Sequence, residues 1–212
     1  ELLVKELADK GVDWARKFGV VKKSGIDISG EEQGLMPDPQ WRKEAKNEDW
    51  YLGNTYHVAI GQGDILTTPL QVNLWTNAIA NHGEYCRPSI AKVKKPDCRR
   101  IGISKDHIET INRGMVKACE TGGTGWPLFN FTVSSNRLNI DNLNFKEAPV
   151  STQSSERRVL VSMACKTGTA EFGDPNGKTH AWFTVFAPFP DPQISITVLI
   201  EEGGEGSSVA AP

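Results

Sequence analysis

The sequence predicts an α/β chain of the α+β type, in which helices flank an antiparallel sheet. Three helical patterns come first, and three β-rich segments separated by short turns follow them. Strands joined by short turns pair in antiparallel order, because a parallel pair needs a crossover of a dozen or more residues. Helical segments followed by a run of strands are typical of α+β folds.

Length and composition narrow the class of protein. The chain has 212 residues, 38% of them hydrophobic and 24% charged, which is ordinary for a packed globular chain. A formal net charge of -2 argues against a nucleic-acid-binding or polybasic membrane-surface protein. No apolar run reaches the ~20 residues of a transmembrane helix, and no signal peptide opens the sequence. The chain starts inside a helical pattern without an initiator Met, so we expect a fragment of a longer protein.

The clearest helical signal begins at Thr68. Its hydroxyl can cap the helix, Pro69 takes the first helical position, and Gln71 completes a Thr-x-x-Gln capping box. We expect this helix to end near Gly83, since glycine is favoured just beyond a helix C-terminus.

A second helix is expected from near Ser104 to the pair Gly122-Gly123. Its predicted buried residues recur at helical spacing: Ile108, Ile111, Met115 and Val116. Between the two helices, residues 84–103 indicate short strands around an exposed basic turn. Residues 24–50 are polar and rich in turn-forming residues, so we expect little regular structure there.

Three β segments complete the prediction: residues 159–170, 181–186 and 194–200. Turns at 173–177 and 190–192 separate them, as in an antiparallel meander. Residues 132–158 are rich in Ser, Asn, Thr and charge, and we expect an exposed insertion.

Several sequence patterns carry no chemistry. Residues 173–179 resemble a phosphate-binding loop, but only three residues stand where that loop needs four, and the segment lies between strands. The four histidines share no i, i+3 or i+4 spacing, and the four cysteines form no CxxC pair. We therefore expect no metal site and no cofactor.

Residues 166–171 can bind a ligand. Lys166 offers a cation, and Thr167 and Thr169 offer hydroxyls at alternate positions, which face one side of a strand. Gly168 leaves room for a ligand backbone. Such a strand edge can pair with a peptide and hold its terminal carboxylate. An ordinary strand end entering a turn is the alternative.

The Lys166-Thr167-Gly168 triplet stands among further segments in a fixed order: residues 18–27, 51–63, 68–71, 166–171, 180–188 and 202–206. Together they resemble the penicillin-binding protein 2 type of class B peptidoglycan D,D-transpeptidase. The resemblance implies a serine-acyltransferase/β-lactamase-like fold. It also implies an enzyme that cross-links stem peptides of the bacterial cell wall by serine acyl transfer and is inhibited covalently by β-lactams.

The resemblance assigns roles to four residues. Lys166 shapes the electric field near the nucleophile and attracts the substrate carboxylate, and the backbone N–H of Thr169 is an oxyanion-hole donor. Thr167, Gly168 and Thr169 bind the substrate. The turn at 60–63 is expected to support the start of the Thr68 helix without a catalytic role. Residues 122–126 are either a cleft-side loop or a plain helix stop.

The family's nucleophile is the serine of a Ser-x-x-Lys motif, which we expect outside this chain. Ser134-Ser135-Asn136 has the letters of the family's Ser-x-Asn motif, but it falls in the polar insertion and is expected to be a chance match. We therefore expect residues 1–212 to be the C-terminal portion of a transpeptidase domain, without the Ser-x-x-Lys region and the final helix.

Other functions remain open: a β-lactam-sensing receptor domain, or a catalytically inactive cell-wall scaffold. A serine β-lactamase is disfavoured, because no Glu-x-x-x-Asn stretch offers a deacylating base. The resemblance implies D-Ala-D-Ala stem peptides, β-lactams and the cell-elongation machinery as partners, with no nucleic acid. It implies the extracytoplasmic face of the plasma membrane, with an anchor helix outside this sequence.

An extracytoplasmic location would allow disulfides. Cys86 and Cys98 flank a predicted strand pair, so their Cα atoms can approach each other. Cys119 and Cys165 either form a second bridge or remain small buried thiols. Four cysteines permit three full pairings, and the sequence does not choose among them.

Overall fold

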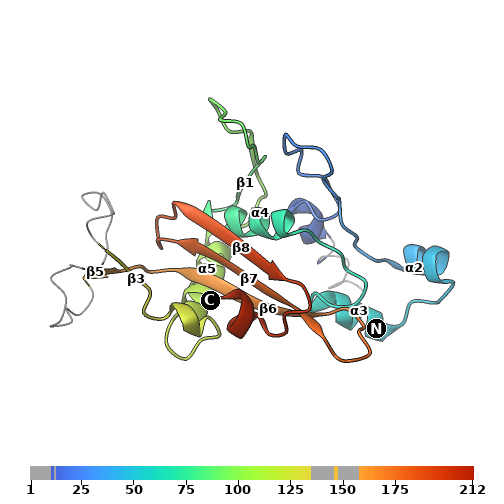
Figure 1. Ribbon diagram of the computed structural model, residues 1–212. Helices are drawn as coiled ribbons and strands as arrows, with labels where there is room; N and C mark the ends of the chain where they lie inside the picture. Colours follow the sequence, from blue (N-terminus) through green and yellow to red (C-terminus); the bar gives the residue numbers. More distant parts are fainter. Residues whose placement is uncertain (1–10, 12, 135–145, 148–157) are drawn as a thin grey trace.

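The computed structural model describes residues 11, 13–134, 146–147 and 158–212. A three-stranded antiparallel sheet of order β6-β7-β8 lies at its centre (Figure 1). Its strands are β6 (Ala164–Glu171), β7 (Thr179–Ala187) and β8 (Ile194–Ile200). The predicted α+β class and the antiparallel meander are confirmed.

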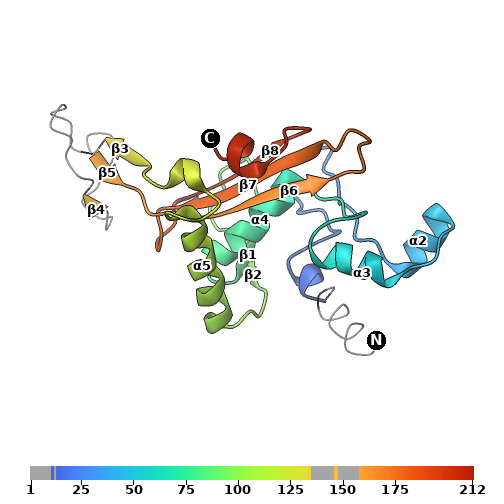
Figure 2. The same ribbon diagram turned by 90° about the horizontal axis from the view of Figure 1, so that it is seen from below.

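Helices cover both faces of this sheet. α4 (Pro69–Ala80) and α5 (Lys105–Cys119) lie on one face, and the short π-helical turn η4 (Gly206–Ala210) lies on the other (Figure 2). Side chains of β7 alternate between the two faces. Phe186 packs against Ala80 of α4, and Phe183 lies in a cluster with Ala210 and Ala211. The sheet therefore has a hydrophobic core on each side.

α4 begins as the capping signal predicts. Thr68 Oγ1 accepts from the Gln71 N–H at 3.1 Å, and Gln71 Oε1 accepts from the Thr68 N–H at 2.9 Å. The helix ends ahead of Gly83, whose φ is +88°. On its buried face, the Thr76 hydroxyl lies 2.8 Å from the Thr184 hydroxyl of β7. This bond satisfies two buried polar groups and fixes α4 on the sheet.

α5 begins after its cap at Ser104, whose hydroxyl accepts from the His107 N–H at 3.3 Å. Ile108 is buried, as predicted. Ile111 was predicted to be buried, which is wrong, since 37% of it is exposed. The buried residue one position further along is Asn112. The packed face of α5 is thus rotated away from Ile111.

Two further helices precede α4: α2 (Pro39–Lys46) and α3 (Leu52–Ala59). The expectation of little regular structure over residues 24–50 is therefore wrong for α2. Its start is capped by Asp38, which accepts from the Trp41 N–H at 2.8 Å. α2 buries no side chain, and besides Pro39 its apolar residues are Trp41 and Ala45 alone, too few to show a helical period.

The predicted strand over residues 159–170 is two strands. β5 (Arg158–Leu160) pairs with β3 (Thr132–Ser134) and β4 (Lys146–Glu147) in a separate antiparallel sheet, and β6 begins at Ala164. An apolar run indicates that residues are buried, but it does not show where the chain passes from one sheet to another. The break between β5 and β6 was therefore missed. Most of the predicted insertion at 132–158 lies outside the described residues. A short 3₁₀ helix, η1 (Trp126–Leu128), precedes β3.

All four cysteines pair. β1 (Glu84–Cys86) and β2 (Cys98–Arg100) form the predicted hairpin, and Cys86 bridges to Cys98 directly opposite. Cys119 at the end of α5 bridges to Cys165 of β6, with Cα atoms 5.7 Å apart. The second bridge joins a helix end to the residue before Lys166. Within the described part of the chain, no helix is long and apolar enough to cross a membrane.

We expect the complete protein, purified without reductant, to show no free thiol at these four positions under denaturing conditions. The Cys119–Cys165 bridge spans 46 positions and the Cys86–Cys98 bridge 12. Chain entropy then predicts losses of roughly 4 and 3 kcal/mol in the free energy of unfolding when each pair is replaced by alanine. Urea denaturation of the two double variants measures both. Four free thiols would contradict both bridges.

Candidate active site

The segment that carries Lys166 lies at an edge of the central sheet. β6 pairs with β7 on one side only, with Lys166 opposite Thr184 and Thr169 opposite Ala181. No described strand pairs with its other side. An edge strand presents a row of backbone N–H and C=O groups, which can pair with an extended ligand.

The contacts of Gln62 show which backbone groups face this open edge. Its side-chain Nε2 donates to the Thr169 carbonyl at 3.0 Å, and its Oε1 accepts from the Glu171 N–H at 3.1 Å. The N–H and C=O of one residue point to the same edge, and alternate residues share an edge. Thr167, Thr169 and Glu171 therefore face outward, and the Thr169 N–H is directed away from β7.

The side chains of β6 divide between the two faces of the strand. Thr167 and Thr169 share one face. There Thr167 Oγ1 donates to Thr124 Oγ1 at 2.9 Å, and Thr169 Oγ1 accepts from the Gly206 N–H at 3.4 Å. Lys166 lies on the opposite face, is exposed, and donates from Nζ to the Thr167 carbonyl. The cation therefore lies beside the backbone groups of the open edge.

Two glycines allow close packing at this strand. A Cβ on Gly168 would lie 3.1 Å from Cβ of Trp182 on β7. A Cβ on Gly206 would lie 2.4 Å from the Gly168 carbonyl oxygen. η4 therefore contacts the backbone of β6 directly, and Gly168 packs closely against Trp182.

Residues 122–125 follow the end of α5 and form a turn that packs against β6. A Cβ on Gly125 would lie 2.6 Å from the Cys165 sulfur, and one on Gly123 would lie 2.4 Å from the Ala118 carbonyl oxygen. These glycines hold Thr124 against Thr167. Sequence analysis did not single out Thr124; the Gly-Gly-Thr-Gly pattern was its only signal.

The turn at 60–63 contacts β6 through Gln62. The sequence interpretation had expected it to support the start of α4. Gly61 and Gly63 adopt φ values of +76° and +79°, which glycine reaches at little cost. The Gln62 N–H donates to the His57 carbonyl at 2.8 Å, which continues the end of α3. This geometry aims the Gln62 side chain at the strand edge, a role that its sequence position did not reveal.

One Ser-x-x-Lys spacing occurs in the chain, from Ser89 to Lys92, and the sequence interpretation overlooked it. It lies in the loop between β1 and β2, where i and i+3 side chains do not share a helical face. Ser89 Oγ lies 3.0 Å from Asp27 Oδ2. Backbone N–H donors from Ile90 and Ala91 lower the pKa of Asp27 to about 2, so its carboxylate is a weak base. This serine is not an activated nucleophile.

Among the remaining sequence candidates, the described residues bring nothing further to β6. Ser134 lies in β3, and the other two residues of its Ser-Ser-Asn triplet fall outside the described residues. Where the structure is described, no three His, Cys, Asp or Glu side chains converge as a metal site would require.

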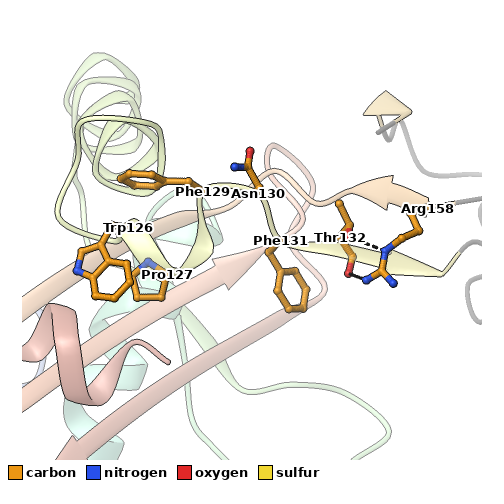
Figure 3. Close-up of a pocket in the computed structure, with 7 residues that line it drawn as sticks. All are labelled: Trp126, Pro127, Phe129, Asn130, Phe131, Thr132 and Arg158. Carbon is orange, nitrogen blue, oxygen red and sulfur yellow. Dashed lines mark hydrogen bonds between the residues drawn. The ribbon is translucent and has the colours of Figure 1, made fainter. Parts of the chain in front are cut away.

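A hollow of about 460 Å³ lies beyond the Thr124 turn (Figure 3). Its lining residues come from η1, β3 and β5 and the segment between them: Trp126, Pro127, Phe129, Asn130, Phe131, Thr132 and Arg158. Figure 3 shows Trp126 and Phe129 on opposite sides of the ribbon. Arg158 donates to Thr132 Oγ1 at 2.8 Å and to the Thr132 carbonyl at 3.0 Å. No residue of β6 lines this hollow, so it is separate from the candidate site.

An α+β fold whose edge strand carries Lys-Thr-Gly, with two hydroxyls on one face, is typical of the penicillin-binding serine acyltransferases. Comparison with known families agrees. The chain belongs to the penicillin-binding protein transpeptidase family, since the model "Penicillin binding protein transpeptidase domain" matches residues 5–212. The resemblance found in the sequence is confirmed.

Individual relatives narrow the type to penicillin-binding protein 2. The peptidoglycan D,D-transpeptidase MrdA of Acinetobacter baumannii is 30% identical over 220 residues, covering 95% of this chain and 29% of the relative. The complex of PBP2 and MreC from Helicobacter pylori matches with TM-score 0.70 at 30% identity, covering 96% of this chain and 33% of that one. Pseudomonas aeruginosa PBP2 in complex with WCK 5153 matches with TM-score 0.69 at 29% identity, and the match covers 93% of this chain and 40% of that one. The chain thus spans 29–32% of the length of the first curated relatives.

Proposed function

We propose that this chain supplies the substrate-pairing strand of a peptidoglycan D,D-transpeptidase, which cross-links stem peptides by serine acyl transfer. The observation that carries the proposal is the open edge of β6. There the outward N–H of Thr169 can donate to the oxygen of a carbonyl under attack. The Thr169 hydroxyl has its proton free to donate to the terminal carboxylate of a D-Ala-D-Ala stem, and the Thr167 hydroxyl turns its proton from Thr124 to the same carboxylate when the stem binds. Each charge-assisted bond is worth about 1.5–3 kcal/mol.

In this reaction the serine oxygen attacks the carbonyl carbon of the penultimate D-Ala, and a base beside the serine takes its proton. The Thr169 N–H stabilises the oxyanion of the tetrahedral intermediate. The C–N bond then breaks, and the terminal D-Ala leaves with the proton on its amine. An amine of a second stem attacks the acyl ester, the C–O bond breaks, and the serine recovers a proton.

Lys166 acts through its charge. Its ammonium group attracts the substrate carboxylate to the strand edge and favours the deprotonated serine. A β-lactam presents a carboxylate and a strained amide in the same positions, so the same edge receives it. Its ring C–N bond breaks on attack, and the leaving nitrogen stays attached to the acyl-enzyme.

The serine itself is proposed to lie outside residues 1–212, because the one Ser-x-x-Lys spacing in the sequence is the loop pair Ser89 and Lys92. Residues 1–212 would then be the C-terminal portion of the transpeptidase domain. We place the complete protein at the extracytoplasmic face of the plasma membrane, held by an anchor helix. Its two disulfides favour an oxidising compartment. The Helicobacter pylori complex of PBP2 with MreC supports a partner in the cell-elongation machinery.

Two assays on the complete protein test the proposal: labelling by a fluorescent penicillin, and cross-linking of a D-Ala-D-Ala donor to an amine acceptor. A transpeptidase gives both signals. A β-lactam sensor gives the label without cross-links, and an inactive scaffold gives neither, so either result would contradict the proposal.

Lys166→Ala should slow acylation by roughly 10- to 150-fold, the equivalent of about 1.5–3 kcal/mol for a contact to a charged group. The matched control is Lys178→Ala, which removes an exposed lysine of the β6–β7 turn that is bonded to Glu202. The control should acylate at the wild-type rate. Equal rates for both variants would remove Lys166 from the site.

A further inference from the structure

The side-chain amide of Gln62 already makes two of the hydrogen bonds that an added strand would make with β6. Its N–H donates to the Thr169 carbonyl and its oxygen accepts from the Glu171 N–H, at 3.0 and 3.1 Å. The same two groups, on alternate residues of one edge, are what a neighbouring strand uses. Gln62 therefore occupies the end of the open edge nearest Glu171.

The surrounding contacts hold Gln62 in this position. The φ-positive residues Gly61 and Gly63 fix the turn on both sides of it. Just beyond the turn, Asp64 forms ion pairs with Arg42, at 3.1 Å, and with Lys46, both on α2. Two helices thus support one amide at the strand edge.

The direction of a bound stem follows from the proposed function, on which this inference rests. The terminal carboxylate lies at Thr167, and the carbonyl under attack lies at the Thr169 N–H. The ligand therefore runs antiparallel to β6, with its N-terminal part towards Glu171. In an antiparallel ladder the acyl residue exchanges both backbone bonds with Thr169. The Thr169 carbonyl has two lone pairs, so it can accept from both the ligand and Gln62.

The next backbone group available to such a ligand is the Glu171 N–H, and Gln62 already pairs with it. We propose that Gln62 is a specificity-determining residue that ends the ligand ladder at Thr169. Backbone recognition is thereby limited to the acyl residue of the stem. The carbonyl two residues before the acyl residue has no free N–H donor on β6, because Gln62 accepts from Glu171. The enzyme therefore does not recognise the backbone of that part of the stem.

Two donors test this inference in the complete protein: N-acetyl-Lys-D-Ala-D-Ala and ε-aminohexanoyl-D-Ala-D-Ala. They share the chain length and the side-chain amine, but only the first carries the acetyl carbonyl that would reach Glu171. The wild-type enzyme should give similar kcat/KM values for both. Gln62→Ala should favour the acetylated donor by roughly 2- to 12-fold, the equivalent of one neutral hydrogen bond.

Two further variants sharpen the test. Gln62→Glu keeps an oxygen acceptor for the Glu171 N–H, so its donor ratio should stay at the wild-type value. Gln193→Ala removes an exposed glutamine side chain of the β7–β8 turn, whose amide donates to the Asp191 carbonyl at 3.4 Å, and should leave the ratio unchanged. Penicillin labelling of Gln62→Ala confirms that the variant is folded.

An unchanged donor ratio in a labelled Gln62→Ala enzyme would overturn the inference, as would a wild-type enzyme that already prefers the acetylated donor by the same factor. Either result leaves the proposed function standing, because the label reports it separately. A wild-type protein that takes up no label would instead contradict the proposed function.

Discussion

A fluorescent penicillin should leave residues 1–212 unlabelled when the complete protein is fully acylated. In the proposed function the strand edge supplies a carboxylate site and one oxyanion donor, but none of the described helices carries both a serine and a lysine. After acylation, proteolysis and mass spectrometry should locate the adduct on a serine outside these residues. The same 212 residues produced alone should give no covalent band on a labelling gel.

Ser89→Ala is the sharpest control for this result, because Ser89 and Lys92 alone have the Ser-x-x-Lys spacing. The exposed Ser89 lies in the β1–β2 loop, so its replacement should leave labelling of the complete protein at the wild-type level. A stoichiometric adduct on the isolated chain, or loss of label in Ser89→Ala, would show that the nucleophile lies within residues 1–212.

Local signals predicted the elements that position the candidate strand. The Thr68 capping box and the Ser104 cap each satisfy backbone donors within one helical turn, so neighbouring residues suffice to reveal them. The turns between β6, β7 and β8 are equally local. α2 was missed because it buries no side chain, and the break before Ala164 was missed because residues 159–165 form one largely apolar run across it.

The contacts that shape the candidate site are long-range, which is why sequence reasoning found only part of it. Lys166, Thr167 and Thr169 share one strand, so their alternation was readable from the sequence. Gln62 and Thr124 reach that strand from 107 and 43 positions away. Each is a polar residue between glycines, a pattern that ordinary turns share. Only the contacts that the turns after α3 and α5 make with β6 reveal their roles.

Thr169→Pro should reduce acylation far more than Thr169→Ala. Alanine removes one hydroxyl contact and keeps the backbone donor, so acylation should slow but persist. Proline removes the same hydroxyl and the N–H as well. The ratio of the two rates therefore isolates the oxyanion donor, for which a single N–H is typically worth ~10²–10³.

The geometry of β6 makes this comparison interpretable. The Thr169 carbonyl accepts from Gln62, so the N–H of the same residue also faces the open edge and makes no ladder bond to β7. Proline is tolerated on edge strands when the missing N–H faces outward, and the preceding Gly168 accepts the restriction that proline imposes. Both variants should therefore keep near-wild-type thermal unfolding midpoints. Thr169→Pro should acylate about 10²–10³-fold more slowly than Thr169→Ala, the factor typical of one oxyanion-hole donor. Equal acylation rates in two folded variants would contradict the assignment of the Thr169 N–H to the oxyanion hole.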